Sequence, residues 1–332
     1  YVIVGGLSTA LTIYGISMIY GMAGTTDIAA IAAQTTIDGM NWMLAVGLVC
    51  MVAGYGFKIA AVPFHMWAPD VYEGSPTPIS LFLATGSKKM GLGVFFQIFL
   101  VLFVAGSSMN AICGEEVQYL FAIIAAFTMT VGNVVAIAQN NIKRMLAYSS
   151  IAQAGYILIA LAVMSEYALS AGLFHMFTHV FMKGGAFLIV GALICAGVGE
   201  KISDYKGLAK RSPFLAAAML LFLFSLAGIP PLAGFTSKFF LFNAALGGVD
   251  GVSSQWVWLA FIAILNSAIS LYYYARVVKA MYVDKGTTEE KIKIPGAFLA
   301  AIVICVVFVI VLGLYPQLIF DYCETAAHAL LG

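Results

Sequence analysis

Long, uninterrupted apolar stretches are the feature of this sequence that most limits what it can fold into. A helix needs about 20 apolar residues to cross the hydrocarbon core of a bilayer. Nine stretches of the 332-residue chain qualify: roughly 1–22, 41–64, 78–105, 117–139, 145–164, 168–197, 213–245, 255–281 and 296–320. Their apolar residues run continuously instead of alternating, which excludes a transmembrane β-barrel. The sequence therefore predicts an all-α, polytopic transmembrane bundle of about nine spans.

The overall composition excludes several classes of protein. The chain is 62% hydrophobic and 9% charged, whereas a soluble domain is about 45–50% apolar and about 25% charged. Its formal net charge of +1 gives no basic excess for binding nucleic acid. None of the 5 cysteines form a CxxC-type pair, and no glycine-rich phosphate loop occurs. We therefore expect no iron–sulfur, zinc, nucleotide or flavin site on this chain.

The charges of the connecting segments test the number of spans independently. The clearly basic connections are the fourth, sixth and eighth, while the second contains acids only. Lys and Arg are absent from the odd-numbered connections, whose acids are Asp27, Asp38, Glu115, Glu116, Glu166 and Asp250. Basic loops stay in the cytoplasm, so the even-numbered connections are predicted to be cytoplasmic. The start of the chain then lies near the cytoplasmic face, and the tail at 323–332 lies outside.

Basic side chains inside the apolar spans are the candidate functional residues. A charge at the bilayer centre costs at least about 2.5–3.5 kcal/mol, so it persists only when hydrated, paired or neutralised. Desolvation disfavours the charged form of an amine, which makes a buried lysine a candidate for proton exchange. The six candidates are Lys58, Lys88, Lys238, His175, His179 and Lys183.

Each candidate also has a simpler structural interpretation. Lys88 and Lys89 lie near the start of a span, where either could extend to the lipid headgroups; we expect Lys89 to do so. His175, His179 and Lys183 recur at intervals of four and so share one helix face. Packed core histidines or a metal-binding pair are alternatives, but a row of three ionisable groups favours a hydrated proton path.

Prolines interrupt two of the spans, Pro63 in one and Pro230–Pro231 in the other. A proline frees the carbonyl one turn earlier, so we expect broken helices at both places. Lys58 precedes the first break and Lys238 follows the second. This mirrored placement is typical of inverted repeats, whose ion sites lie at such breaks. His65, just after Pro63, could cap the broken end or take part in the path.

Three segments carry a resemblance to a known family: GFKIAAVPFHMWAPDVYEGSPTP at 56–78, NIKRMLAYSS at 141–150 and SLAGIPP at 225–231. The chain resembles subunit N of complex I, the NADH:quinone oxidoreductase, and the similar subunit of archaeal F420H2 dehydrogenase. The histidine segment at 175–183 resembles the larger antiporter-like subunits L and M and sodium/proton antiporter subunits.

The resemblance implies a fold of about fourteen helices with two inverted five-helix repeats, of which this chain is similar to helices 6 to 14. Residues 1–105 would be the C-terminal part of the first repeat, 106–282 the second repeat, and 283–332 a C-terminal helix and tail. Lys58, Lys88 and Lys238 would match the lysines of helices 7, 8 and 12. The family's glutamate partner of Lys58 would precede Tyr1. Because the sequence begins inside an apolar run without an initiator Met, we interpret its start as a truncation or an incompletely recorded N-terminus.

The function implied is proton translocation by buried Lys and His residues, as one membrane-arm subunit of a redox-driven complex. Flavin, iron–sulfur clusters and a quinone or methanophenazine site would belong to partner subunits. The membrane would be a prokaryotic cell membrane, or else an organelle inner or thylakoid membrane. A stand-alone cation/proton antiporter and a non-pumping scaffold of the membrane arm are the alternatives.

Overall fold

The computed structural model describes residues 1–34, 42–103, 107–247, 255–286 and 290–331, and over these ranges the chain is helical without a β-sheet. The helices in chain order are α1 (Val2–Ala23), α2 (Ile28–Ala32), α3 (Trp42–Ile59), α4 (Trp67–Gly74), α5 (Thr77–Phe82), the π-helix η1 (Leu83–Ser87), α6 (Lys88–Leu102), α7 (Ser108–Ile137), α8 (Ile142–Val163), α9 (Glu166–Cys195), the 3₁₀-helix η2 (Ile202–Tyr205), α10 (Leu208–Arg211), α11 (Pro213–Ala227), α12 (Ala233–Ala245), α13 (Val257–Tyr282), α14 (Gly296–Leu314) and α15 (Gln317–Leu331).

Seven helices within the described ranges are long and apolar enough to cross a membrane: α1, α3, α7, α8, α9, α13 and α14. The two other expected spans are each divided. Residues 77–102 form α5, η1 and α6 in direct succession, with the π-helix ending just before Lys88. Residues 213–245 form α11 and α12, separated by the break at Pro230–Pro231. The predicted transmembrane helical bundle is therefore confirmed.

Both predicted helix breaks are present. The first falls between α3 and α4, where Ala60 has a left-handed φ of 57°. The backbone N–H of Val62 in this break donates to the Thr128 hydroxyl of α7 at 3.0 Å, which satisfies a group that the interrupted helix leaves free. At the second break Gly228 closes α11 in the left-handed conformation, with φ of 93°, where a residue without Cβ is favoured.

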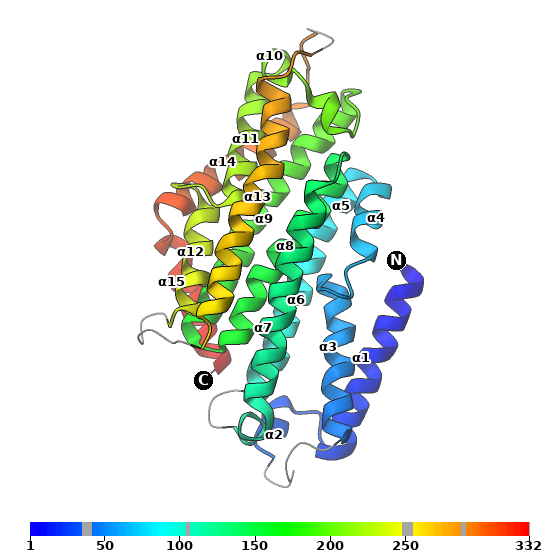
Figure 1. Ribbon diagram of the computed structural model, residues 1–332, viewed down its shortest axis with the longest axis vertical. Helices are drawn as coiled ribbons and strands as arrows, with labels where there is room; N and C mark the ends of the chain where they lie inside the picture. The colour runs from blue at the N-terminus through cyan, green and yellow to red at the C-terminus, as the bar shows by residue number, and fades with distance from the viewer. Residues whose placement is uncertain (35–41, 104–106, 248–254, 287–289, 332) are drawn as a thin grey trace.

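The helices lie side by side along the long axis of the molecule (Figure 1). Helices α8 and α9 are the most buried spans, whereas α1 and α14 are largely exposed at the periphery. Helix α7 packs along α8, and α9 contacts α8, α11, α12, α14 and α15. The polar residues of α8 and α9 are thus enclosed by apolar helices, which places them away from lipid.

Ion pairs join the connections that were predicted to share the cytoplasmic face. Arg144 at the start of α8 contacts Asp70 at 2.6 Å and Glu73 at 2.8 Å, both on α4. Lys143 contacts Glu200, in the segment after α9, at 2.9 Å. Three even-numbered connections therefore meet at one end of the bundle, towards the top of Figure 1. This confirms that these connections lie on one side.

The opposite end gathers the odd-numbered connections and the C-terminus, at the bottom of Figure 1. His328 Nδ1 lies 3.4 Å from a carboxylate oxygen of Glu166, so the C-terminal segment and the fifth connection share a side. Asp38 and Asp250, two of the acids assigned to this side, lie outside the described residues.

Two details of the predicted spans are wrong. Helix α7 begins at Ser108, not near 117, so Glu115 and Glu116 lie on a helix, after a kink at Cys113. The segment expected to be a tail is helix α15, which packs against α9. Its buried residues Phe320, Cys323 and Ala327 recur every three or four positions, the pattern of an amphipathic helix.

Candidate functional site

Lys238 lies on the second turn of α12 and points back at the break that precedes this helix. Its ammonium group donates to three oxygens: the carbonyls of Leu226 at 2.9 Å and Ala227 at 3.3 Å, and the Ser267 hydroxyl at 3.0 Å. The two carbonyls belong to the end of α11, where the last C=O groups have no partner within the helix and carry its negative dipole. The break thus supplies neutral oxygens that stabilise a buried cation.

His175 of α9 is joined to this lysine through protein groups. Its Nδ1 lies 2.8 Å from the Ser237 hydroxyl, and its Nε2 lies 2.9 Å from Oε1 of Gln153 on α8. The Gln153 amide then donates to the Leu226 carbonyl at 3.1 Å, the same oxygen that accepts from Lys238. Gln153 and Leu226 therefore fix His175 relative to the ammonium group of Lys238.

Two further lysines bind consecutive serines of α8. Lys88 of α6 donates to Ser150 at 3.2 Å, and Lys183 of α9 donates to Ser149 at 2.7 Å. Consecutive residues of an α-helix are about 100° apart around its axis, so the two amines approach α8 from different sides. Ser149 also hydrogen-bonds the Tyr274 hydroxyl of α13. Helix α8 therefore carries the groups that link the lysines of α6 and α9.

His179 occupies the interval between Lys183 and His175 on α9. Its ring centroid lies 6.3 Å from that of His175, and it lies one turn before Lys183 on the same face of α9. Neither ring nitrogen has a hydrogen-bond partner among the described residues, although the side chain is fully buried. A buried polar group without a partner is costly, so we expect bound water to serve these nitrogens.

Lys58, at the end of α3, is the predicted residue that the structure leaves apart. It is partly exposed and has no hydrogen bond or ion pair with any residue in the described ranges. The aliphatic part of the Lys58 side chain packs against α6 at Gly91. A Cβ atom added to this glycine would lie 2.9 Å from the Cγ atom of Lys58. Gly91 is one turn after Lys88, so Lys58 lies beside the row formed by the other candidates without being bonded to it.

The other five candidates form one row through the bundle, in the order Lys88, Lys183, His179, His175 and Lys238. Each is at most 2% exposed. Across the parts of the chain that the structure describes, no carboxylate pairs with any of them. Apart from His179, the members of the row are held by hydroxyl, amide and carbonyl oxygens.

Sequence reasoning missed several hydrogen-bond partners of this row. Ser149, Ser150 and Gln153 are polar positions within the apolar run 145–164, and that interruption is the signal that could have identified them. Lys89 was expected at the lipid headgroups, and in the structure its side chain is partly exposed.

The alternative of a metal site finds no support in the geometry. Both ring nitrogens of His175 are engaged by protein side chains. Where the chain is described, no group of three His, Cys, Asp or Glu side chains is placed to hold a metal ion.

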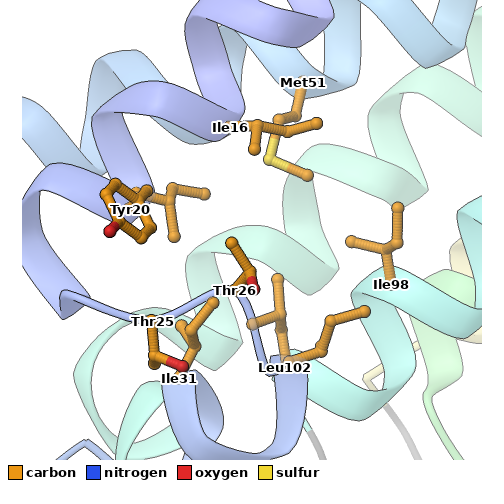
Figure 2. A pocket seen from close by; sticks show the side chains of 10 residues that line it. Ile16, Tyr20, Thr25, Thr26, Ile31, Met51, Ile98 and Leu102 are labelled. Carbon is orange, nitrogen blue, oxygen red and sulfur yellow. The ribbon is translucent and has the colours of Figure 1, made fainter.

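A separate cavity of about 170 Å³ lies between α1, α2, α3 and α6. Figure 2 shows that isoleucines, Leu102 and Met51 form most of its wall, with Tyr20, Thr25 and Thr26 as the polar groups. It contains no group that titrates near neutral pH, so it offers no step for a proton and lies apart from the basic row.

Comparison with known proteins identifies the fold to which the row belongs. Residues 1–270 match the family described as NADH:quinone oxidoreductase/Mrp antiporter, transmembrane. The chain belongs to this family. It is a multi-pass integral membrane protein, as both the family and the apolar helices show.

Curated members of the family are similar over the whole chain. The chain is 44% identical to F420H2 dehydrogenase subunit N of Methanosarcina mazei, covering 100% of this chain and 66% of that protein. It is 43% identical to NADH-quinone oxidoreductase subunit N of Desulforamulus reducens, covering 100% of this chain and 67% of that protein. The chain thus spans about two thirds of the length of these relatives.

Solved structures of the family share the arrangement of helices. A chain of respiratory complex I from Thermus thermophilus is 31% identical with a TM-score of 0.77, over 97% of this chain and 67% of that one. A chain of the archaeal membrane-bound sulfane sulfur reductase is 28% identical with a TM-score of 0.87, over 100% and 65%. A chain of the Mrp complex from Dietzia sp. is 22% identical with a TM-score of 0.86, over 100% and 69%, and shows the fold alone.

Proposed function

We propose that this chain translocates protons as an antiporter-like membrane subunit of a redox-driven respiratory complex. The observation that carries the proposal is the row of buried basic groups, most of which are hydrogen-bonded to neutral side chains or carbonyls and none of which has a carboxylate partner within the described residues. A buried charge without a counter-ion is costly and is retained mainly at functional sites. Structural ion pairs would instead bring acids into the row.

The proton would be taken up from the cytoplasmic side near Lys58 and pass to Lys88. The serine hydroxyls of α8 can donate and accept at once, so they can connect Lys88 to Lys183. The proton would then reach His179, His175 and finally Lys238, from which it is released outside. Imidazole suits the middle of this path, because the unperturbed pKa of this group is close to neutral pH.

Repulsion between like charges would couple the steps. A proton arriving on one amine disfavours the charged form of its neighbour, so a charge change at one end of the row is passed along it. The breaks beside Lys58 and Lys238 support a further part of the proposal: residues 1–105 and 106–282 belong to two inverted repeats, each with its ion site at a broken helix.

The driving energy would come from partner subunits in a prokaryotic cell membrane. Relatives of this chain are named as subunits of NADH-quinone oxidoreductase and F420H2 dehydrogenase. We propose that the chain belongs to such a complex, in which other subunits carry flavin, iron–sulfur clusters and the quinone or methanophenazine site. The chain itself would supply the proton path and no redox centre.

The test uses the full-length protein in its assembled complex, with electron transfer and proton pumping measured together. Lys238→Ala should abolish pumping through this subunit, and Lys238→Arg should also impair it, because arginine keeps its proton. Lys210→Ala, on the exposed surface of α10, is the matched control and should pump normally. Normal pumping by both Lys58→Ala and Lys238→Ala, with assembly confirmed, would contradict the proposal.

The same experiment separates the two alternative functions. Sodium-dependent proton transport by the protein without partner subunits would favour a stand-alone antiporter. If the lysine variants changed only the amount of assembled complex and not its pumping, the chain would be a scaffold.

A further inference from the structure

A tyrosine ring lies close to the last two groups of the basic row. The ammonium group of Lys238 lies over the face of Tyr156, 4.6 Å from the ring centroid. On another side of the ring lies the imidazole of His175, 6.5 Å away in an edge-to-face arrangement. Tyr156 is on α8 and fully buried. It is therefore in contact with both the donor and the acceptor of the final proposed proton transfer.

Buried polar side chains from α7 and α13 hold this ring in place. The Asn133 amide donates to the Tyr156 hydroxyl at 3.4 Å and to the Asn266 side chain at 3.2 Å. Its carbonyl oxygen accepts from the Tyr273 hydroxyl at 2.9 Å. Asn266 in turn donates to Thr130 at 3.1 Å. Since both amide hydrogens and the oxygen of Asn133 are engaged, this network fixes the tyrosine hydroxyl relative to three helices.

We propose that Tyr156 is a positioning residue that sets the proton affinity of Lys238, and that Asn133 holds its ring against the ammonium group. The inference rests on the proposed function, because it concerns the last group of that path. The face of an aromatic ring attracts a cation and not a neutral amine. The ring therefore favours the protonated form of Lys238 without supplying a counter-ion.

The three interior lysines differ in how well their cations are stabilised. Lys238 has three oxygen acceptors and a ring face at 4.6 Å. Lys88 has one serine and the ring of Tyr72 at 5.8 Å. Lys183 has one serine within the described residues. The most stabilising surroundings thus lie at the end of the row, which draws the proton towards Lys238.

The test measures the pH profile of proton pumping by the assembled complex. Tyr156→Leu removes the ring that stabilises the ammonium form of Lys238, so Lys238 should lose its proton at a lower pH. The decline of pumping at alkaline pH, the alkaline limb of the profile, should therefore move towards acid by about one pH unit, the size expected for a desolvated cation–π contact. Tyr156→Phe keeps the ring and should move the limb much less. Tyr205→Leu removes another fully buried tyrosine, at the cytoplasmic end on η2, and should leave the limb in place.

A fluorinated series keeps the test decisive if Tyr156→Leu fails to assemble. Replacing Tyr156 by phenylalanine with zero to three ring fluorines weakens the negative face in steps while nearly keeping its shape. The alkaline limb should move towards acid with each fluorine. An unchanged limb across the series would overturn the inference. If Lys238→Ala abolishes pumping in the same preparation, the proposed function survives that result; if Lys238→Ala pumps normally, the proposed function fails.

Discussion

Gln153→Glu is the substitution that most directly tests the link between His175 and Lys238. The Gln153 amide and the Lys238 ammonium share the Leu226 carbonyl, at 3.1 and 2.9 Å, so the two groups lie within about 6 Å of each other. A carboxylate at position 153 would place a negative charge beside a lysine that otherwise contacts only neutral groups among the described residues.

The size of the effect follows from this separation. Two unit charges about 6 Å apart interact by about 3 kcal/mol at an effective dielectric constant of about 20. That corresponds to about two pH units, or about a hundredfold change in the ratio of charged to neutral lysine. The attraction favours the ammonium form, so release from Lys238 at neutral pH is disfavoured and returns only at higher pH.

We expect Gln153→Glu to lower the proton-pumping rate at pH 7 by about tenfold or more and to move its optimum to alkaline pH, the opposite direction from Tyr156→Leu. Proton uptake by vesicles containing the assembled complex measures this from pH 6 to about pH 9. The control is Gln139→Glu, the same change directly after the end of α7, where the Gln139 side chain donates to the Val135 carbonyl. A Gln153→Glu complex of normal composition with the wild-type profile would refute the argument.

Two other predictions test the second break and the orientation in the membrane. Gly234→Ala should prevent accumulation of the assembled complex, because the added Cβ would lie 1.7 Å from the Ser225 carbonyl oxygen; Gly93→Ala, with nothing within 4 Å, should assemble normally in the same immunoblot. Cys195 is the exposed cysteine at the end of α9, on the side that the loop charges predict to be cytoplasmic. It should react with a membrane-impermeant maleimide in inside-out vesicles and not in right-side-out ones.

The fold was largely predictable because a bilayer imposes simple conditions on a sequence. Continuous apolar runs gave the spans, and prolines within them gave the breaks at Pro63 and Pro230–Pro231. The charges of the connecting segments predicted which connections share a face of the membrane, and Arg144 and its partner acids on α4 do lie together. Helix α15 was missed because its charged residues Asp321, Glu324 and His328 suggested a tail, although its apolar positions follow a helical period.

The candidate site was predictable only as a set of residue types. Ionisable groups in apolar runs are conspicuous, so the six basic residues could be chosen from the sequence. Their order in space could not be predicted, because it depends on contacts between helices. Lys88 lies on α6 and Lys183 on α9, yet both donate to serines of α8. The role proposed for Tyr156 was equally hidden, since an aromatic residue in a membrane span attracts no notice until a cation is found on its face.

The neutral surroundings of Lys238 have a consequence for how the protein responds to voltage. Helix α11 has 15 residues, so its end lies about 22 Å from its start, a distance shorter than the thickness of the hydrocarbon core, which is about 30 Å. A positive charge on Lys238 has no acid partner among the described residues. Inside the membrane it would experience part of the transmembrane electric field, which is worth about 2.3 kcal/mol per charge per 100 mV for a full crossing. Loading and unloading of this amine would therefore generate current, and a rising membrane potential would oppose turnover at this residue directly.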